Sequence, residues 1–281
     1  MRHATASAGR LVSAVHTGTI RMYLALVRAG FRRYATYRTA LVASMSANIA
    51  FGFLRCSVLL AVVAGAGRAA GGYDASRLAT YVWAGQGLIG TVLLWNPPEL
   101  IERIRSGEVV TDLLRPVNLV WQQLANDLGW AGYGALTRFV GPMIVGTLAF
   151  DLFAPRRLAT YAFFLISVVL AVIVCFGCRF LLSATTYWLL DARGVWMGWS
   201  IGSVVLSGMQ FPLWFLPSPV AGVLYVASPA ASIIQVPLDI LVERTPAGPV
   251  LALQVAWAVI LLGACQLVQR RAERRLVIQG G

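Results

Sequence analysis

The sequence contains no lysine: all 23 of its basic residues are arginines, against 11 aspartates and glutamates. Without lysine the chain cannot form the phosphate-binding loop G-x-x-x-x-G-K-[ST], whose lysine reaches the β- and γ-phosphates of a nucleotide. It also cannot form a Schiff base between a lysine and a carbonyl substrate. The chain is therefore not expected to be an enzyme, and it cannot hydrolyse ATP through a P-loop of its own.

Charged residues of either sign are few. They make up 12% of the 281 residues, whereas 58% are hydrophobic and the mean hydropathy is +0.73. Soluble domains carry roughly twice this charged fraction. The composition predicts an integral membrane protein, and the net charge of +12 is then assigned to cytoplasmic loops, so that nucleic acid is not an expected partner.

Residues that ligate metals are scarce and poorly placed. His3 and His16 both lie in the N-terminal tail, and the four cysteines lie in apolar stretches. Cys175 and Cys178 have the C-x-x-C spacing of a metal or redox pair, but packing is the preferred interpretation because no completing ligand is near. No histidine or glutamate falls within a predicted span, which disfavours a membrane-embedded metalloenzyme and an ion-coupled carrier.

The apolar runs predict an all-α integral membrane fold with six transmembrane helices in a single domain over residues 18–281. Each run is long enough to cross ~30 Å of hydrocarbon. Residues 1–17 are small, polar and basic, and are expected to form a flexible, dispensable tail. The six spans are expected at about 39–64, 78–95, 132–150, 161–178 or 161–190, 195–215 and 249–268.

Two further segments are apolar without being spans. Residues 211–249 contain seven of the twelve prolines, which break helices, so short re-entrant or interfacial helices are expected there. Ahead of the first span, an apolar stripe flanked by arginines predicts an interfacial helix that lies on an anionic leaflet. The stripe consists of Ile20, Tyr23, Leu24, Val27, Phe31 and Tyr34.

The longest charged segment between two apolar runs is residues 96–116, NPPELIERIRSGEVVTDLLRP. Asn96 is a favoured N-cap, Pro97 suits the first helical position, and Glu99 stands where a capping box places a carboxylate. Pro116 is expected to begin the following helix.

Opposite charges in this segment are spaced for ion pairs along one helix. Glu99 and Arg103 are related as i and i+4, and Glu102 and Arg105 as i and i+3, with the acid first in both pairs. Gly107 is expected to end the helix. A short, rigid, doubly charged helix between two spans is interpreted as the contact for a partner; the alternative is a solvated connector.

Arginine placement predicts the orientation. If both termini and the 96–116 and 191–194 loops are inside, the inner side holds 15 arginines, the outer loops hold 5 and the spans hold 3. The positive-inside rule favours this arrangement over its inverse. Arg156 and Arg157 are a mild exception, since they fall on the outer side.

A few polar residues lie at membrane depth. Asn48 and Arg55 are seven residues apart and share a face of the first span, so Arg55 is expected to face the interior; the alternative is snorkelling to the outer interface. Arg179 is expected to extend to the inner interface. Packing is the favoured role for three glutamines, and the alternatives are hydrogen bonds between helices or a contact with substrate. These residues are Gln86, Gln210 and Gln254.

From about residue 20 onward the sequence resembles the permease subunits of ABC transporters of the ABC-2 type, and in particular the ABC-2 family transporter proteins. The resemblance rests on the basic helix before the first span and on the run I-x-x-G-E-[hydrophobic]-x-x-x-L-L-R-P at Ile104–Pro116. It also rests on Phe211-Pro212-Leu213, followed by further prolines.

The resemblance implies a coupling helix in the loop between spans two and three, which docks on a separate ATP-binding subunit, and a second contact between spans four and five. It places Glu99, Glu102, Arg103, Arg105 and Glu108 on the coupling helix, and Asp191 and Arg193 in the second contact. Asn48, Arg55, Gln86 and Gln210 are the candidates for a transport pathway or a subunit interface.

The function expected from these features is that of a permease subunit that exports a hydrophobic or amphipathic compound. ATP and Mg²⁺ would be bound by the partner and no cofactor by this chain. A second permease subunit, identical or different, and membrane lipid are the other expected partners. The expected location is the plasma (inner) membrane of a prokaryote, with both termini cytoplasmic. The alternatives are a self-contained ion-coupled carrier, or a membrane scaffold without an ATPase.

Overall fold

The computed structural model describes residues 20–33, 38–65, 70–95, 97–115, 117–189 and 192–279. Within these ranges every regular element is a helix. The predicted tail 1–17, together with Asn96, Pro116 and Asp191, lies outside the described residues.

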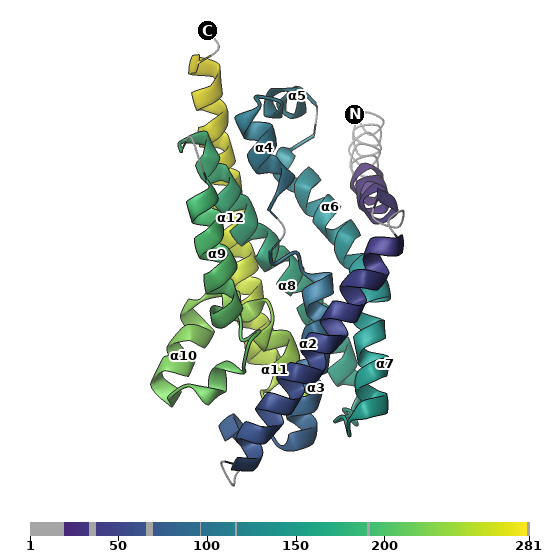
Figure 1. Cartoon of the computed structure of the whole chain (residues 1–281). Helices are drawn as coiled ribbons and strands as arrows, with labels where there is room; N and C mark the ends of the chain where they lie inside the picture. The colour runs from purple at the N-terminus through teal and green to yellow at the C-terminus, as the bar shows by residue number, and fades with distance from the viewer. Residues whose placement is uncertain are drawn as a thin grey trace, which may run out of the picture.

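The long helices run roughly side by side (Figure 1). They are α2 (Arg38–Gly65), α3 (Ala75–Thr91), α6 (Leu119–Gly134), α7 (Val140–Ala149), α8 (Leu158–Ala184), α9 (Arg193–Leu206) and α12 (Ala247–Gln279). A further helix, over residues 20–33, precedes them. The short elements are η1 (Ala70–Gly72), α4 (Glu99–Arg105), α5 (Val109–Leu113), η2 (Ala135–Phe139), η3 (Thr185–Tyr187), η4 (Leu213–Phe215), α10 (Ser218–Ala227), η5 (Pro229–Ser232) and α11 (Gln235–Leu241).

Three helices of the described part are long and apolar enough to cross a membrane. They are Ser44–Gly65 within α2, Leu158–Tyr187 across α8 and η3, and Ala247–Arg274 within α12. They coincide with the first, fourth and sixth predicted spans, and the fourth follows the longer of its two predicted ranges. The all-helical membrane fold expected from composition is thus confirmed.

Two predicted spans are shorter than expected. The helix predicted over 78–95 ends at Thr91, because Val92 is extended just ahead of the loop that contains Pro97 and Pro98. The helix predicted over 195–215 ends at Leu206, where Gly208 takes the left-handed conformation (φ 75°) typical of helix ends. The 14 residues of α9 span about 21 Å, less than ~30 Å of hydrocarbon.

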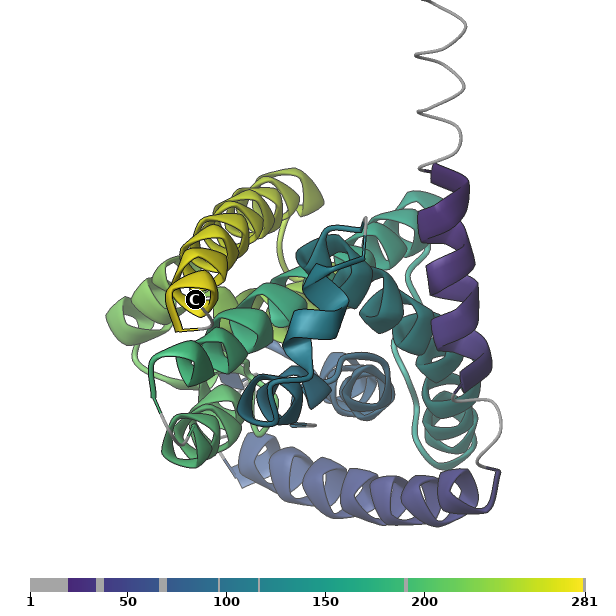
Figure 2. The same cartoon turned by 90° about the horizontal axis from the view of Figure 1, so that it is seen from above.

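Helix α3 lies at the centre of the bundle. In the view along the bundle other helices surround it (Figure 2), and its residues from Leu78 to Leu88 are buried without a break. It contacts α2, α6, η2, α7 and α11. Helices meet closely here because the contact residues are glycines. A Cβ at Gly87 would overlap the Phe139 ring, and one at Gly134 would overlap the carbonyl oxygen of Gly90.

The neighbour of α3 is one continuous helical run from Leu119 to Ala149 that contains a π-helical turn at Ala135–Phe139. Pro142 accounts for this turn, because proline lacks the N–H that would bond to the carbonyl of Arg138 and its ring crowds that carbonyl. The third span was predicted at 132–150; its helix begins earlier, at Leu119, with Asn118 as its N-cap.

The turn after α9 is held by side chains from distant elements. The Tyr81 hydroxyl donates to the Gly208 carbonyl (2.7 Å), and the backbone N–H of Gln235 donates to the Ser207 carbonyl (2.9 Å). The side chain of Gln235 also takes part, since its Oε1 accepts from the backbone N–H of Leu213 (2.9 Å). Buried Asp239 then accepts from Trp214 Nε1 (2.8 Å), Gln235 Nε2 (2.9 Å) and the Tyr73 hydroxyl. This polar network fixes the short helices η4 and α11 against α3.

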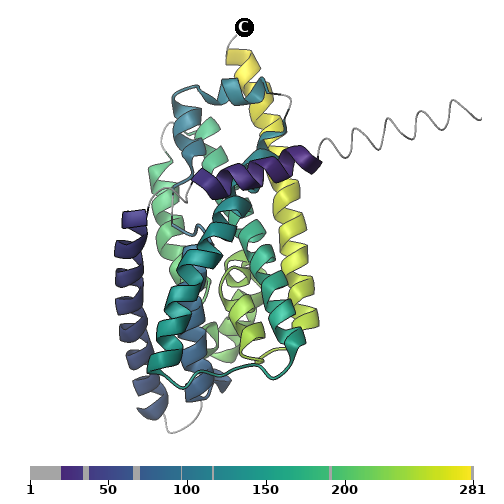
Figure 3. The ribbon, with the colours of Figure 1, turned by 90° about the vertical axis from the view of Figure 1, so that its right-hand side faces the viewer.

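The elements predicted to be cytoplasmic gather at one end of the bundle. The C-terminus, α4, α5 and the helix over residues 20–33 lie there, whereas α10 and α11 lie toward the other end (Figure 1). The helix over residues 20–33 runs across the long helices (Figure 3) and packs on α6, where Phe31 meets Tyr133 edge-on (5.7 Å between centroids). We call the two ends the inner and outer ends below.

Gly134→Ala is expected to lower the stability of the bundle by about 1–3 kcal/mol, because the added methyl group overlaps backbone that cannot move aside. Thermal unfolding of the purified protein in detergent measures the effect. Gly263→Ala is the matched control, since its Cβ meets no heavy atom within 4 Å. Equal unfolding midpoints for the two variants would contradict the close packing of α3.

Candidate functional site

The charged loop between α3 and α6 forms two short helices instead of the one predicted. Helix α4 begins at Glu99, with Pro98 at the cap position and no side-chain cap bond, so the predicted start at Asn96 and Pro97 is wrong. The second of two consecutive prolines is extended (ψ 134°) and delays the helix. Gly107 ends α4 with φ 79°, as predicted, and α5 then begins at Val109. We call α4 and α5 together the inner platform.

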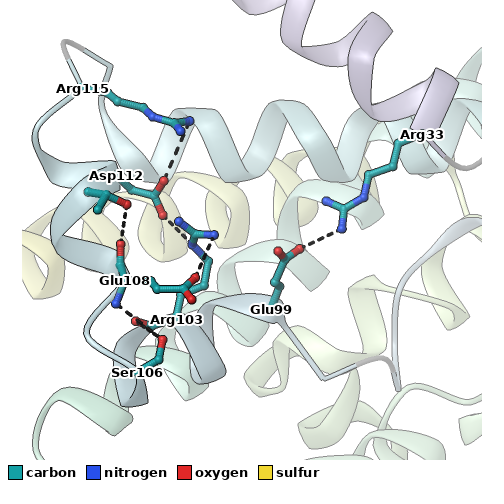
Figure 4. Close-up of polar contacts among 8 residues, drawn as sticks. Arg33, Glu99, Arg103, Ser106, Glu108, Asp112 and Arg115 are labelled. Carbon is teal, nitrogen blue, oxygen red and sulfur yellow. Dashed lines mark hydrogen bonds and ion pairs between the residues drawn. The ribbon is translucent and has the colours of Figure 1, made fainter.

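Arg103 joins the two helices of the inner platform. Its Nε donates to Asp112 Oδ2 (2.6 Å) and its Nη1 lies 3.5 Å from Glu108 Oε2 (Figure 4). The hydrogen bond to Asp112, a side chain only 5% exposed, raises the pKa of the Arg103 guanidinium. The predicted ion pair of Arg103 with Glu99 is wrong, because the chain turns at Gly107 and brings α5 next to the Arg103 guanidinium. Sequence spacing gave no signal for Asp112.

Asp112 also lies 3.9 Å from Arg115, and two further ion pairs of the platform join exposed side chains. Glu102 and Arg105 form the predicted pair (3.5 Å), and Glu99 instead pairs with Arg33 of the N-terminal helix (3.2 Å; Figure 4). Both side chains of the Arg33–Glu99 pair are more than half exposed, so this pair adds little stability and is readily broken.

The underside of the platform is apolar and anchors it to three long helices. Leu100 and Val109 are buried in a cluster with Leu124 of α6, Phe180 of α8 and Cys265 of α12. Burial of such side chains contributes about 1.5–3 kcal/mol each. The platform is therefore fixed to the inner ends of α6, α8 and α12.

The outward surface of the platform combines apolar and charged side chains. Leu114 is 81% exposed and Val110 is also exposed, beside the exposed carboxylates of Glu102 and Glu108. Leu114 directly follows α5, whose residue Val109 is buried, so its exposed side chain is held in a fixed place and is available to a partner.

The second predicted contact lies next to the platform. An apolar cleft of about 510 Å³ separates α4 from α9 and is lined by Pro97 and Ile101 on one side and by Ala192, Arg193 and Trp196 on the other. The structure therefore brings Arg193 to the same end of the bundle as α4. Its predicted companion, Asp191, lies outside the described residues.

A buried ion pair lies beneath the platform. Arg179 Nη1 is 2.8 Å from Asp127 Oδ2, and both line a cavity of about 240 Å³ that reaches Glu99 and Arg33. The prediction that Arg179 extends to the inner interface is wrong, since the side chain is buried and turned toward α6. Sequence analysis missed this pair because the two residues are 52 positions apart.

A second polar group lies deeper, between α2 and α3. The guanidinium of Arg55 is buried and donates to the carbonyl of Met209, in the turn after α9. In the amide orientation that satisfies its polar atoms, Gln86 donates to Asn48 Oδ1 (2.6 Å) and accepts from Arg55 Nη1 (3.2 Å). Arg55 thus faces the interior of the chain, whereas Gln210 is exposed beside this group.

Comparison with known proteins identifies the family of the chain. The family model described as ABC-2 family transporter protein matches residues 49–280. No curated protein matches the chain. The matched range includes the inner platform, the Asp127–Arg179 pair and Arg55 with Gln86 and Met209, whereas Asn48 lies one residue before it.

Asp127→Asn is expected to destabilise the protein by about 3–5 kcal/mol, because it leaves the Arg179 charge buried without its counter-ion. Thermal unfolding in detergent is the measurement, with exposed Asp151→Asn as the control. The double variant Asp127→Leu/Arg179→Met removes both charges and should recover most of the loss. An Asp127→Asn midpoint equal to that of the control would contradict the buried pair.

Arg55→Leu is expected to cost about 1–3 kcal/mol, since the Met209 carbonyl and Gln86 lose their donor. Two measurements on the variant test this placement of Arg55: the yield of membrane-inserted protein and the midpoint of its thermal unfolding in detergent. A lipid-facing arginine would behave oppositely, with equal or higher yield after substitution and an unchanged midpoint.

Proposed function

Because the chain belongs to the ABC-2 family of transporter proteins and is a membrane component of an ABC transporter, we propose that a separate ATP-binding subunit drives it by docking on the inner platform. The ATP-binding subunit would bind ATP and Mg²⁺. The observation that carries this proposal is the construction of the platform: its outward face exposes Leu114 and Val110 among charged side chains, while its underside is buried.

The way in which the platform is held supports a role in transmitting motion. Leu100 and Val109 are embedded between α6, α8 and α12, so a displacement imposed by the ATP-binding subunit must move the inner ends of these helices. The contact with α9 is different, because the apolar cleft between α4 and α9 leaves space for the two to move relative to each other. ATP binding would thus shift α8 and α12 against α9.

The membrane arrangement that we propose has six spans and cytoplasmic termini. The three long apolar helices are joined by α3, by the run Leu119–Ala149 and by α9 extended by the turn after it. The N-terminal helix, both platform helices and the C-terminal end of α12 lie at one end, as a cytoplasmic face requires (Figure 3). The arginine distribution supports a cytoplasmic position for this end, and the location that we propose is the plasma (inner) membrane of a prokaryote.

A second permease subunit, identical or different, would complete the transporter. On α9 the exposed side chains of Met197, Ile201 and Val205 are apolar, and no heavy atom lies within 4 Å of a Cβ added at Gly194 or Gly198. Glycines on an exposed apolar helix allow close packing of another helix.

The cargo that we propose is a hydrophobic or amphipathic compound, moved outward. A cleft of about 260 Å³ between α2, α3 and η2 supports this class of cargo. It is lined by Phe51, Ile89 and Trp95 together with the polar groups of Asn48 and Arg138. The polar part of an amphipathic compound would meet Asn48 and Arg138, and Asn48 is held in place by its bond to the Gln86 carbonyl (2.9 Å).

Leu114→Ala is expected to weaken association with the ATP-binding subunit by about tenfold or more, as for truncation of an interface anchor. Co-purification and the ATPase activity of the assembled complex measure it. The protein itself should remain stable, because the side chain is almost fully exposed.

Leu158→Ala is the matched control, since Leu158 is 87% exposed at the outer end. Arg103→Leu provides a second comparison, because it breaks the bonds that join α4 to α5 and should abolish docking even with Leu114 intact. If Leu114→Ala and Leu158→Ala assemble equally well, the platform is a solvated connector and the docking proposal fails.

A further inference from the structure

The outer end of the bundle contains a cleft to which the transport mechanism assigns no role. It has a volume of about 560 Å³ and lies between the start of α8 and the segment that leads into α12. The residues that give it its character are Arg156, Arg157, Thr160, Phe163, Glu243 and Arg244.

The cleft has an excess of positive charge. Arg156 and Arg157 are exposed and form no ion pair within the described part of the chain. Arg244 is held rigidly: it donates to the Gly71 carbonyl (2.6 Å from Nη2) and lies over the rings of Trp214 (4.3 Å) and Tyr73 (5.2 Å). Among the described residues, no carboxylate lies at ion-pair distance from the Arg244 guanidinium.

The one acid of the cleft is already engaged. Glu243 Oε1 accepts a hydrogen bond from the Thr160 hydroxyl (2.7 Å), which ties the segment before α12 to the first turn of α8. Glu243 is also the one non-glycine residue of the described chain with a positive φ (52°). This conformation closes the C-terminus of α11, where the backbone N–H of Glu243 donates to the Ile240 carbonyl (3.1 Å) and that of Arg244 donates to the Asp239 carbonyl (2.9 Å).

The position of the two arginines is unusual for a membrane protein. Arginine in a short outer loop opposes the orientation that the positive-inside rule selects, and yet Arg156 and Arg157 are adjacent and precede α8 directly. Both line the cleft. A ligand that needs two neighbouring guanidinium groups gives a physical reason to keep them there.

Apolar surface continues from the cleft along the bundle. Phe163 lines the cleft itself, and farther along the two helices, toward the inner end, Ile166 of α8 and Val259 of α12 are exposed. Helices α8 and α12 pack against each other along their length. A ligand bound here meets cationic groups at the outer end and an apolar surface along α8 and α12.

We propose that this cleft binds the phosphate group of an anionic phospholipid of the outer leaflet, with its acyl chains lying along α8 and α12. Guanidinium groups match the oxygen atoms of a phosphate in pairs, and such charge-assisted bonds are among the strongest in proteins. The assignment to the outer leaflet rests on the orientation given under Proposed function, whereas binding itself does not depend on an ATP-binding subunit.

The test uses the purified full chain in a neutral detergent, titrated with phosphatidylglycerol, and reads bound lipid by native mass spectrometry and the unfolding midpoint by thermal shift. Phosphatidylcholine and inorganic phosphate are titrated in parallel. We expect phosphatidylglycerol to bind more strongly than phosphatidylcholine and to raise the midpoint. The effect should weaken with added salt because the cleft is open to solvent.

Arg156→Gln/Arg157→Gln is expected to weaken phosphatidylglycerol binding about tenfold or more. The matched control is Arg270→Gln/Arg271→Gln, which removes two adjacent exposed arginines from the inner end with the same change in net charge. Glu243→Gln keeps the oxygen that accepts from Thr160 but removes the negative charge, so it should strengthen binding.

Equal losses in the two double variants would overturn the proposal, since they would show attraction to net charge alone. A Glu243→Gln variant that binds less lipid would also contradict it. If inorganic phosphate displaces the lipid at millimolar concentration and stabilises the protein by itself, the ligand is a soluble phosphate compound and the lipid assignment is wrong. Because none of these readouts involves an ATPase, failure here leaves the docking proposal untouched.

Discussion

The contact between α3 and the helical run Leu119–Ala149 is the constraint on which the arrangement of the other helices depends. Glycines on both sides let the two backbones meet, with Gly134 directly against Gly90 and Gly87 against Phe139. In a lipid environment, packing of this kind replaces the hydrophobic driving force that water provides in soluble proteins. With α3 fixed in this way, its remaining faces receive α2 and α11, and its hydroxyl at Tyr81 reaches the turn after α9.

Helices α8 and α12 connect the two ends of the molecule. At the inner end they hold the platform through Phe180 and Cys265, and at the outer end Thr160 and the segment before α12 form the cationic cleft. Between these points they pack against each other, with Ser167 and Gln254 hydrogen-bonded in the interior (2.7 Å). The two helices therefore form a packed pair that links the platform at the inner end to the cleft at the outer end.

The sequence predicted the parts of this structure that depend on local pattern. Apolar runs located α2, α8 and α12, and Gly107 ended α4 as expected. The errors arose where distant segments decide. Arg103 bonds to Asp112, which a turn of the chain brings near, and not to its i,i+4 partner. Arg179 pairs with Asp127 of another helix and does not extend to the interface. Helix α9 ends earlier than predicted, at the turn that Gln235 holds through hydrogen bonds. Arg55 was placed inside correctly, because the cost of a charge in lipid does not depend on knowing its partner.

The turn after α9 has a consequence for the order in which the chain is assembled during synthesis. Its backbone groups at Ser207, Gly208 and Leu213 bond to Tyr81, made earlier, and to Gln235, made later. An unpaired backbone group in hydrocarbon costs several kcal/mol. The turn therefore obtains its final hydrogen bonds only after Gln235 has been translated, so that residues 193–241 complete their fold as one unit.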